Sequence, residues 1–432
     1  MESAELRWLG MLMVLTISVS GAASPAAGPG EQPVGVSTAG PVRYDAGFFA
    51  RFSPRTALDM VNAVPSFSLR DMGEERRGFS GAVGNVLIDG ERPSAKSQSL
   101  QDILQRIPAA QVRWIEVLRG TETRADASDS TVLVNVVRTP SAGGGVWSTG
   151  FEYAQQHEAA PNGFLSWTGR VGRLDYGVGA SSYSLRRELP GQRRIGNAEG
   201  ELTGLRYETS PREFAEYAVN GEAAHDLFGG RLRVTGQVYR SDYEQANTLE
   251  SFATDGTFTG DELAPYGEGK RTVELGTTFD TAIAGWDWTL ATLFTRARFD
   301  SDSHVTNRDA SFGIDSQFRQ LLTRDSGESI VRTTLVHVLT PAQRLEFGVE
   351  GALNTLDANL DLTGIYDGVA VPIHIPNANM HVEEHRGEAF IAHTWRGARW
   401  STEARLAGEI SRLDFSGDVD QRVDLSYAKP SL

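Results

Sequence analysis

The larger part of this chain alternates apolar and polar residues with a period of two. The alternation is clearest in residues 231–238, 272–279, 344–354 and 400–410. Successive side chains of a β-strand point to opposite faces, so each stretch predicts a strand with one apolar and one polar face. A helix would need a period of about 3.6 residues. Residues 145–432 are therefore expected to form β-structure and not a helical bundle.

Short turns and longer polar segments alternate between the expected strands. The short turns lie near Gly172, Gly229, Gly285, Ala342 and Gly397. The longer segments, which we expect to be loops, cover residues 189–211, 246–269, 301–324 and 357–381. Outer-membrane barrels have short periplasmic turns and long extracellular loops, whereas a soluble sandwich has no reason to collect long loops at one end. The pattern predicts an antiparallel up-and-down transmembrane β-barrel over residues 145–432, with an exported soluble solenoid or sandwich as the alternative.

The N-terminus has the composition of an export signal. An apolar run from Trp8 to Ser20 is followed by the small residues Gly21–Ala23. A helix of that length spans roughly 20 Å, short of the ~30 Å hydrocarbon core of a bilayer. Residues 1–23 are therefore predicted to be a signal peptide, with an N-terminal anchor or a buried strand as the alternative. Residues 24–43 are rich in Pro, Gly, Ala and Ser and predict a flexible leader.

Charge and cysteine content exclude several classes of protein. The 432 residues carry a formal net charge of −15, so the chain lacks the basic surplus with which proteins coat nucleic acid. No cysteine is present, which excludes disulfides, thiolate metal sites, Fe–S clusters and a cysteine nucleophile. We expect no nucleic-acid partner and no resident cofactor.

Residues 44–140 mix helical and strand patterns and predict a small α+β domain. Helical signals cover 53–61 and 99–107. Short apolar strands are expected at 86–88, 114–118 and 132–137. A Gly-rich stretch at 141–145 then marks the boundary to the alternating region.

Several segments of this domain resemble, in family order, the plug domain of TonB-dependent outer-membrane receptors. They are Ala57–Val61, Val64–Phe67, Arg77–Phe79, Gly84–Pro93, Leu104–Pro108, Val112–Gly120 and Val134–Val137. Tyr427–Leu432 also resembles a segment of the family's barrel. The stretch Thr121–Thr131 departs from the family, which carries small Gly-rich residues at that point. The resemblance implies a plug domain followed by a transmembrane barrel.

The resemblance also marks individual residues. The plug-motif residues are Arg77, Gly78, Asp89, Gly90, Arg92, Glu116, Arg119 and Gly120. Asp89 and Gly90 predict a left-handed turn between two buried strands. Glu116 and Arg119 are expected to pair with charges on the barrel wall, which would hold the plug without an apolar interface. A solvated strand edge is the alternative for this pair.

A receptor of this family would contact TonB through a short N-terminal TonB box. The candidate box is Val34, Gly35, Val36, Ser37 and Thr38, with a plain linker as the alternative. The resemblance implies active uptake of a scarce, bulky nutrient (a ferric siderophore, haem, cobalamin or an oligosaccharide) across the Gram-negative outer membrane. Outer-membrane lipid and an extracellular small ligand would be the other partners. A surface receptor that senses its ligand without transport and a passive porin-like channel are the alternatives.

Enzyme motifs are weak. Residues 381–385 spell H-x-x-E-H, a zinc-peptidase string that needs both histidines on one helical face. The string opens a period-two segment, and on a strand four residues span ~13 Å, too far for two ligands at ~2 Å from one ion. No phosphate-binding loop or G-x-S-x-G nucleophile elbow occurs. We expect no catalytic residues and no metal site.

The number of strands suggests that the barrel is incomplete. About 11–12 strands can be placed after residue 145, and bacterial barrels are closed with an even number of strands. A twelve-stranded barrel has a backbone radius of roughly 13 Å, too narrow for a ~100-residue plug with an outer radius of roughly 17 Å. A barrel of about 22 strands, with a radius of roughly 24 Å, would hold it. We therefore expect about 11–12 of about 22 strands, arranged as an open sheet with two free edges.

Overall fold

The structure is a computed structural model that describes residues 42–70, 84–90, 99–119, 132–139, 143–153, 159–366, 368–397 and 400–431. Every described residue lies in one compact unit. Among these residues, no helix is long and apolar enough to cross a membrane.

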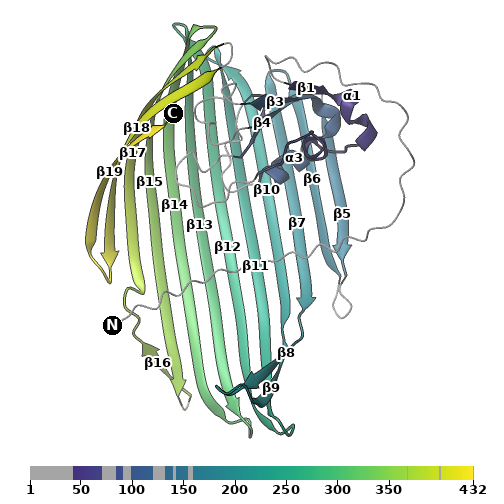
Figure 1. The fold of residues 1–432 in the computed structure, drawn as a ribbon, viewed down its shortest axis with the longest axis vertical. Coiled ribbons are helices and arrows are strands. Elements are labelled where there is room, and N and C mark those ends of the chain that lie inside the picture. The colour runs from purple at the N-terminus through teal and green to yellow at the C-terminus, as the bar shows by residue number, and fades with distance from the viewer. Residues whose placement is uncertain are drawn as a thin grey trace. The chain divides into compact units, whose positions relative to one another are not determined.

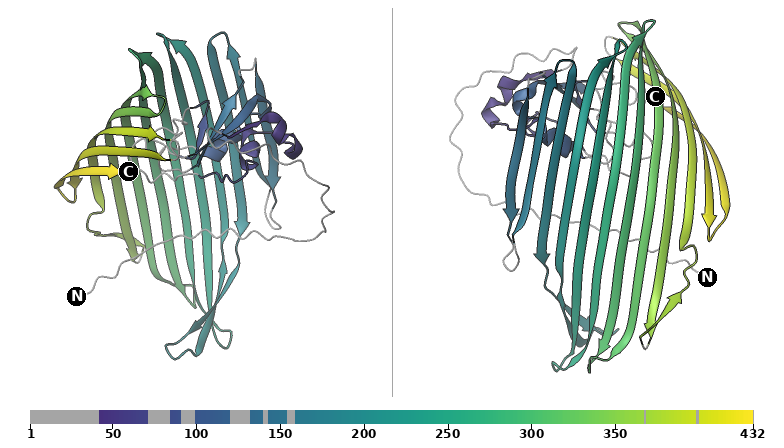
Figure 2. Two further views of the ribbon diagram at one scale, coloured as in Figure 1. Left: turned by 45° about the horizontal axis from the view of Figure 1, so that its top comes forward. Right: turned by 180° about the vertical axis from the view of Figure 1, so that it is seen from behind.

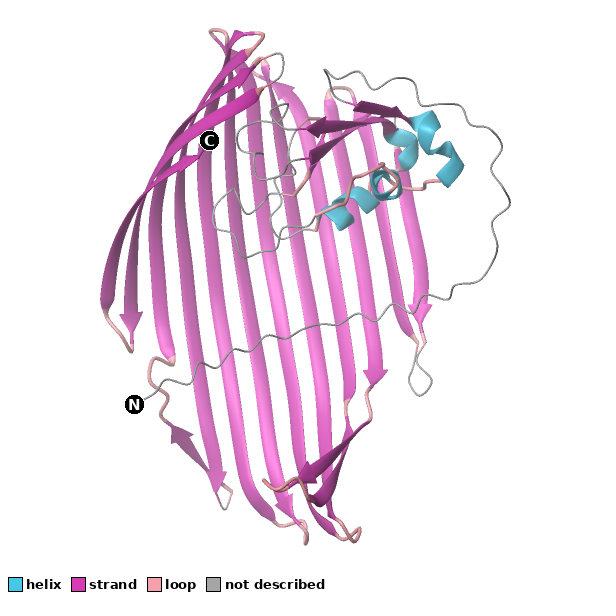
Figure 3. Cartoon of the chain, in the orientation of Figure 1, coloured by secondary structure: helices cyan, strands magenta, loops and turns pink. Residues whose placement is uncertain are grey.

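Residues 42–139, hereafter the small domain, contain all the described helices (Figure 3). The helices are α1 Ala46–Phe49, the 3-10 helix η1 Ala50–Phe52, α2 Ala57–Asn62, α3 Leu100–Gln105 and the 3-10 helix η3 Ala109–Gln111. The strands are β1 Val42–Asp45, β2 Val86–Ile88, β3 Val112–Arg119 and β4 Val132–Arg138. They form a sheet in the order β1-β3-β4-β2, in which β2 runs parallel to β4 and the other pairs are antiparallel. The expected mixed α+β architecture is confirmed.

The two longer helices of the small domain begin at capping residues. Thr56 Oγ1 accepts a hydrogen bond from the Asp59 N–H at 3.3 Å, and the Asp59 carboxylate accepts from the Thr56 N–H at 3.0 Å, so the two form a capping box. Ser99 Oγ accepts from the Asp102 N–H at 3.0 Å at the start of α3. Helix α2 therefore starts later than the pattern at 53–61 predicts, because the N-cap is Thr56 and not Ser53.

The small domain has its own apolar core. Phe49, Leu104, Ile115 and Val134 are fully buried in it, together with the apolar faces of α2 and β2. Burying one such side chain stabilises a fold by about 1.5–3 kcal/mol. The small domain can therefore be treated as a packed body with a polar exterior.

The remaining strands form one large antiparallel sheet. In chain order they are β5 Gly144–Glu152, β6 Ala160–Val171, β7 Leu174–Glu188, β8 Gly191–Gly196, β9 Leu202–Thr209, β10 Pro211–Leu227, β11 Gly230–Ala253, β12 Phe258–Ile283, β13 Trp286–Asp309, β14 Ile314–Thr340, β15 Gln343–Tyr366, β16 Val369–Ile373, β17 Asn379–Arg396, β18 Ser401–Gly417 and β19 Gln421–Ser431. Twelve of them pair in sequence order from β5 to β19, while β8, β9 and β16 lie off this path (Figures 1 and 2). The predicted up-and-down topology is confirmed. In the described part of the chain β5 and β19 do not pair with each other, so the sheet is open, as expected.

Tight two-residue turns join the strands at one end of the sheet, as predicted. Phe228 and Gly229 have φ of 50° and 75°, and Ala284 and Gly285 have φ of 52° and 82°. Two consecutive residues with positive φ are typical of the type I′ turn, whose twist matches that of the flanking strands. Gly172 has φ of 60° in the turn between β6 and β7.

The prediction of long loops at the other end of the sheet is wrong. Residues 246–269 form the paired ends of β11 and β12 around a turn near Gly256, and 301–324 form the ends of β13 and β14 around a turn near Phe312. Likewise 189–211 contain β8 and β9, and 357–381 contain the end of β15, β16 and the start of β17. Polar residues fall on both faces in much of these segments, so the alternation is interrupted although the backbone ladder continues.

The large sheet has two chemically different faces. Side chains on one face contact the small domain, and we call this the inner face; cross-strand register carries the assignment from β6 to β19. The opposite, outer face holds exposed apolar side chains, including Val178, Val219, Val238, Val273, Leu275, Phe294, Val331, Val349, Ile391 and Leu406. An exposed apolar band of this extent is unusual for a soluble surface and marks contact with a partner or a membrane.

Candidate functional site

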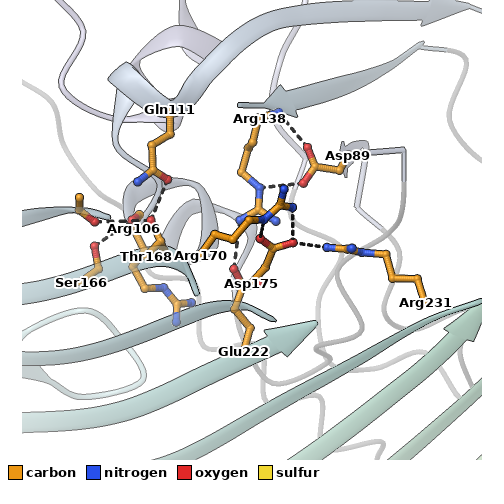
Figure 4. Close-up of polar contacts among 11 residues, drawn as sticks. Asp89, Arg106, Gln111, Arg138, Ser166, Thr168, Arg170, Asp175, Glu222 and Arg231 are labelled. Atoms are coloured by element: carbon orange, nitrogen blue, oxygen red, sulfur yellow. Dashed lines mark hydrogen bonds and ion pairs between the residues drawn. The ribbon is translucent and has the colours of Figure 1, made fainter. Parts of the chain in front are cut away.

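The contact between the small domain and the inner face depends most on Arg138, the last residue of β4. Its Nε donates to Asp89 Oδ2 at 2.8 Å within the small domain, and its Nη1 donates to Glu222 Oε1 on β10 at 3.0 Å (Figure 4). The side chain of Arg138 is 19% exposed and that of Glu222 is 38% exposed. Burial lowers the pKa of Arg138, but Glu222 and Asp89 outweigh it and raise that pKa above its ordinary value, so the guanidinium stays charged.

Two further hydrogen bonds join the end of α3 and the start of β3 to strand β6. Ser166 Oγ donates to the Arg106 carbonyl oxygen at 2.8 Å, and Thr168 Oγ1 donates to Gln111 Oε1 at 2.7 Å (Figure 4). Ser166 is 1% exposed and Gln111 is 8% exposed, so the seam excludes solvent at this point. Ile88, Ile103 and Ile107 of the small domain line a small cavity beside these bonds, so the seam combines polar and apolar contacts.

Two glycines on β7 allow the small domain to approach the sheet closely. A Cβ on Gly179 would lie 2.8 Å from Asn220 Oδ1 and 3.1 Å from Arg106 Cδ. A Cβ on Gly177 would lie 2.9 Å from Glu222 Cγ. Any larger residue at these positions would push Arg106 or Glu222 away from its place in the seam.

A cavity of about 330 Å³ lies beside Arg138, between the small domain and strands β6, β7, β10 and β11. A second set of charges lines it: Arg170 Nη2 donates to Asp175 Oδ2 at 2.7 Å, and Arg231 pairs with the same carboxylate (Figure 4). Gln111 also lines the cavity, and its buried Nε2 has no hydrogen-bond partner among the described residues. A volume of this size with charged walls holds several waters at about 30 Å³ each, so the seam is hydrated on this side.

The inner face carries a second network farther along the sheet, on β14 to β19. Arg386 pairs with Glu350 at 2.5 Å and with Glu409 at 3.6 Å. Lys429 pairs with Glu409 at 2.5 Å and with Glu388 at 3.1 Å. Arg386 is only 8% exposed. Its charge is therefore compensated by carboxylates on both neighbouring strands.

Asp89 and Gly90 form the predicted left-handed turn, with φ of 53° and 84°. The turn follows β2, whose described partner is the parallel strand β4. The turn therefore does not join two paired successive strands, as was expected. Asp89 Oδ1 accepts from the Arg138 N–H at 2.8 Å, and Asn135 Oδ1 accepts from the Gly90 N–H at 2.8 Å. The turn therefore positions the carboxylate that holds Arg138.

Glu116 does not make the expected contact with the wall. Its carboxylate accepts from Arg43 at 2.8 Å, from Trp114 Nε1 at 2.9 Å and from Asn135 Nδ2 at 3.1 Å, all within the small domain. The expectation is wrong because Glu116 lies on β3 between β1 and β4, where a cross-strand arginine reaches it first. Arg119 ends β3. Arg77, Gly78, Arg92, Gly120 and the candidate TonB box Val34–Thr38 lie outside the described residues, as does the predicted signal peptide.

The environment of Glu116 predicts a pH-dependent stability of the small domain. Burial opposes ionisation, but hydrogen bonds from Arg43, Asn135 and Trp114 prevail and hold the pKa of Glu116 below its ordinary value. A lowered folded-state pKa stabilises the fold above the unfolded pKa of ~4.3, and the effect is lost as pH falls through the folded value. Glu116→Gln should therefore destabilise the small domain by about 1–2 kcal/mol at pH 7 and have little effect near pH 3. Calorimetry of the detergent-solubilised chain at both pH values tests this, and an unchanged difference at low pH would contradict it.

The H-x-x-E-H string does not form a metal site. On β17, His381 and His385 lie on the outer face, where they hydrogen-bond to Asp357 and Glu383 at 2.6 Å each. Glu384 lies on the inner face and accepts from Ser411 Oγ at 2.8 Å. Among the described residues, no group of three or more His, Asp or Glu side chains could hold a metal ion.

The sequence reasoning missed Arg138 and Glu222, which make the main ion pair of the seam. Arg138 directly follows the motif Val134–Val137, so its position at the end of a strand of the small domain could be predicted. Nothing distinguishes Glu222 from the other polar residues that alternate along β10. The closely spaced pair Gly177 and Gly179 was the one available signal that a side chain approaches this part of the sheet.

No model of a known protein family matches the sequence, and no curated protein matches it. Solved structures resemble it at low similarity. The ferric yersiniabactin uptake receptor FyuA from Yersinia pestis has 11% sequence identity and a TM-score of 0.30, over 91% of this chain and 79% of that chain. The ferric-catecholate import receptor Fiu from E. coli has 10% identity and a TM-score of 0.30, over 91% and 80%. A mutant of the ferric enterobactin receptor PfeA from Pseudomonas aeruginosa has 12% identity and a TM-score of 0.25, over 90% and 80%. The similarity to these structures is too low to support a functional assignment, which rests instead on the residues described above.

Proposed function

We propose that this chain belongs to the TonB-dependent outer-membrane receptors and takes up a scarce, bulky nutrient. The observation that carries the proposal is the pairing of a packed small domain with the polar face of a sheet whose other face is apolar. A lipid-facing exterior and a polar lumen explain this division of the sheet. The resemblance of the small domain to the family's plug supports the same assignment.

The seam suits a domain that has to move. Its polar contacts are an ion pair, two side-chain hydrogen bonds and a cavity with charged walls, and they lie beside Ile88, Ile103 and Ile107 of the small domain. Water can replace each of these bonds, so displacing the small domain costs far less than unfolding it. A pull from the inner membrane, delivered by TonB near the N-terminus, would therefore separate the domain from the wall without destroying either.

The substrate class follows from the resemblance and not from any residue of the site. Ferric siderophores, haem, cobalamin and oligosaccharides are the candidates, bound from outside the cell. Signal-peptide export, insertion in the outer membrane and a TonB box at Val34–Thr38 complete the proposal.

Growth and uptake experiments test the proposed function. Cells with and without the gene are grown under iron limitation with one candidate ligand supplied at a time, and accumulation of the labelled ligand is measured. Gene-dependent accumulation that stops when an uncoupler collapses the proton-motive force is the expected result. Accumulation that survives the uncoupler would indicate a passive channel, and ligand binding without accumulation would indicate a sensing receptor. Recovery of the protein from the periplasm without detergent would contradict the membrane location itself.

A further inference from the structure

On the outer face, the apolar band ends abruptly in a row of arginines. Val238 on β11 and Val273 on β12 are the last apolar residues of their strands in this band, and Phe294 is the last on β13. The next outer-face positions are Arg240, Arg271 and Arg296, with Arg298 one step beyond Arg296. The arginines therefore mark the edge of the apolar band on three adjacent strands.

Three of these arginines are direct cross-strand neighbours. Arg240 pairs in register with Arg271, and Arg271 pairs in register with Arg298. Residues directly opposite each other in an antiparallel sheet have Cβ atoms about 4.5–5.5 Å apart, and like charges at such positions are destabilising. A row of three like charges calls for a compensating anion.

The protein supplies carboxylates to the two flanking arginines and none directly to the central one. Arg240 Nε donates to Asp242 at 2.7 Å, and Arg298 Nε donates to Asp300 at 2.8 Å. Arg298 also lies 3.7 Å from Asp325. Arg271, at the centre of the row, is exposed and makes no side-chain hydrogen bond or ion pair with any described residue.

On one side of Arg271 the neighbouring carboxylates are those of Asp242 and Asp300, which the flanking arginines hold. The outer-face position beyond Arg271 is Gly269, which has no side chain; a Cβ there would lie 3.3 Å from Asp300 Oδ2 and 3.6 Å from Asp242 Oδ1. Arg296, on the other side, directs its Nη1 to the Thr295 carbonyl oxygen at 2.8 Å and lies 4.2 Å over the Phe294 ring. The central guanidinium therefore has room for a ligand and donors left to bind it.

The geometry points to a binding site for the phosphate-bearing head group of a membrane lipid, centred on Arg271 and flanked by Arg240 and Arg298. The site continues the apolar band, so acyl chains would cover Val238 and Val273 while the phosphate meets the arginines. Guanidinium groups bind phosphate through two parallel N–H donors, and they do so well at the border of an apolar surface. At the same border, strands β14, β15 and β17 instead carry Asp325, Asp357 and His381, so the site is confined to β11–β13.

This inference rests on the proposed membrane location, and the test separates the two. The delipidated chain in detergent is titrated with short-chain phosphatidylglycerol, with phosphatidylcholine and with inorganic phosphate, and bound lipid is counted by native mass spectrometry. Arg271→Gln is compared with Arg412→Gln, since Arg412 is also an exposed outer-face arginine but faces His385 and Asp424, with no arginine beside it. Arg271 has no partner to lose, so folding of its variant should be unchanged, which the heat-induced shift in gel mobility checks.

The expected result is preferential binding of phosphatidylglycerol that weakens about tenfold in Arg271→Gln, as the loss of one charge-assisted hydrogen bond predicts, and stays unchanged in Arg412→Gln. Equal weakening in both variants, or none in either, would overturn the site. Displacement of the lipid by equimolar inorganic phosphate would overturn the lipid assignment. A protein that is soluble without detergent would instead refute the membrane location.

Discussion

Replacing Arg386 with alanine should destabilise the large sheet by about 3–5 kcal/mol, because it removes the cation that lies 2.5 Å from the Glu350 carboxylate and one of the cations that pair with Glu409. Glu350 and Glu409 lie on the strands either side of β17 and are each 12% exposed, so water cannot fully replace the guanidinium. Lys429 would still reach Glu409 but not Glu350. The unfolding temperature in detergent, followed by the change in gel mobility, measures the effect.

Two variants sharpen this prediction. Arg386→Lys keeps the charge but loses one of the two carboxylate contacts, so its loss of stability should be intermediate. Arg412→Ala removes an outer-face arginine that is 55% exposed and paired with Asp424, and it should change the unfolding temperature little. If Arg412→Ala destabilised the sheet as much as Arg386→Ala, the inner network would have no special role.

Replacing Arg138 with alanine should free the small domain from the sheet. The change removes the ion pair to Glu222 on the sheet, whereas the bond to Asp89 lies within the small domain and only positions Arg138. Because Glu222 is partly exposed, we expect a loss of about 2 kcal/mol in the free energy of docking. A loss of that size raises the population of the undocked state roughly 30-fold. Ser166 lies beneath Arg106 and is accessible only when the domain lifts away.

The chain contains no cysteine, so a single Ser166→Cys reports this opening by its rate of thiol labelling. The rate should rise roughly 30-fold when Arg138→Ala is added, and by a similar factor with Glu222→Ala, which removes the same ion pair from the side of the sheet. Arg113→Ala is the matched control, since Arg113 is an exposed arginine of the same domain that lies over Trp114 and away from the seam. Equal labelling rates in Arg113→Ala and Arg138→Ala would show that Arg138 does not hold the domain.

The sequence was informative wherever local chemistry decides the structure. The helix within 99–107, the turn at Asp89 and Gly90, and the period-two strands all follow from nearest neighbours, whereas the N-cap of α2 is Thr56 and not the expected Ser53. The same reasoning failed at 246–269 and 301–324, where polar residues occupy both faces of a continuing hairpin. Polar residues in these segments indicate exposure to water, and they do not indicate whether the backbone forms strand-to-strand hydrogen bonds.

Contacts between distant segments were beyond that reasoning. The alternation of residues along the strand placed Glu116 on the polar face and predicted a contact with the barrel wall. Its carboxylate instead pairs with Arg43, 73 residues away along the chain. Glu222 meets Arg138 across 84 residues, and neither residue differs in kind from its neighbours. The arginine row on the outer face likewise appears only when the register of β11, β12 and β13 brings Arg240, Arg271 and Arg298 together.

The most direct test of the proposed mechanism is the labelling of Ser166→Cys in living cells that produce the protein as their genome encodes it. Arg173→Cys, in the exposed turn between β6 and β7, serves as the reference for reagent access. The account predicts that Ser166→Cys is labelled slowly at rest and faster when the substrate is present and the inner membrane is energised, and that an uncoupler abolishes the increase. A labelling rate that is the same with and without the proton-motive force, while Arg173→Cys reacts normally, would contradict an energy-driven displacement of the small domain.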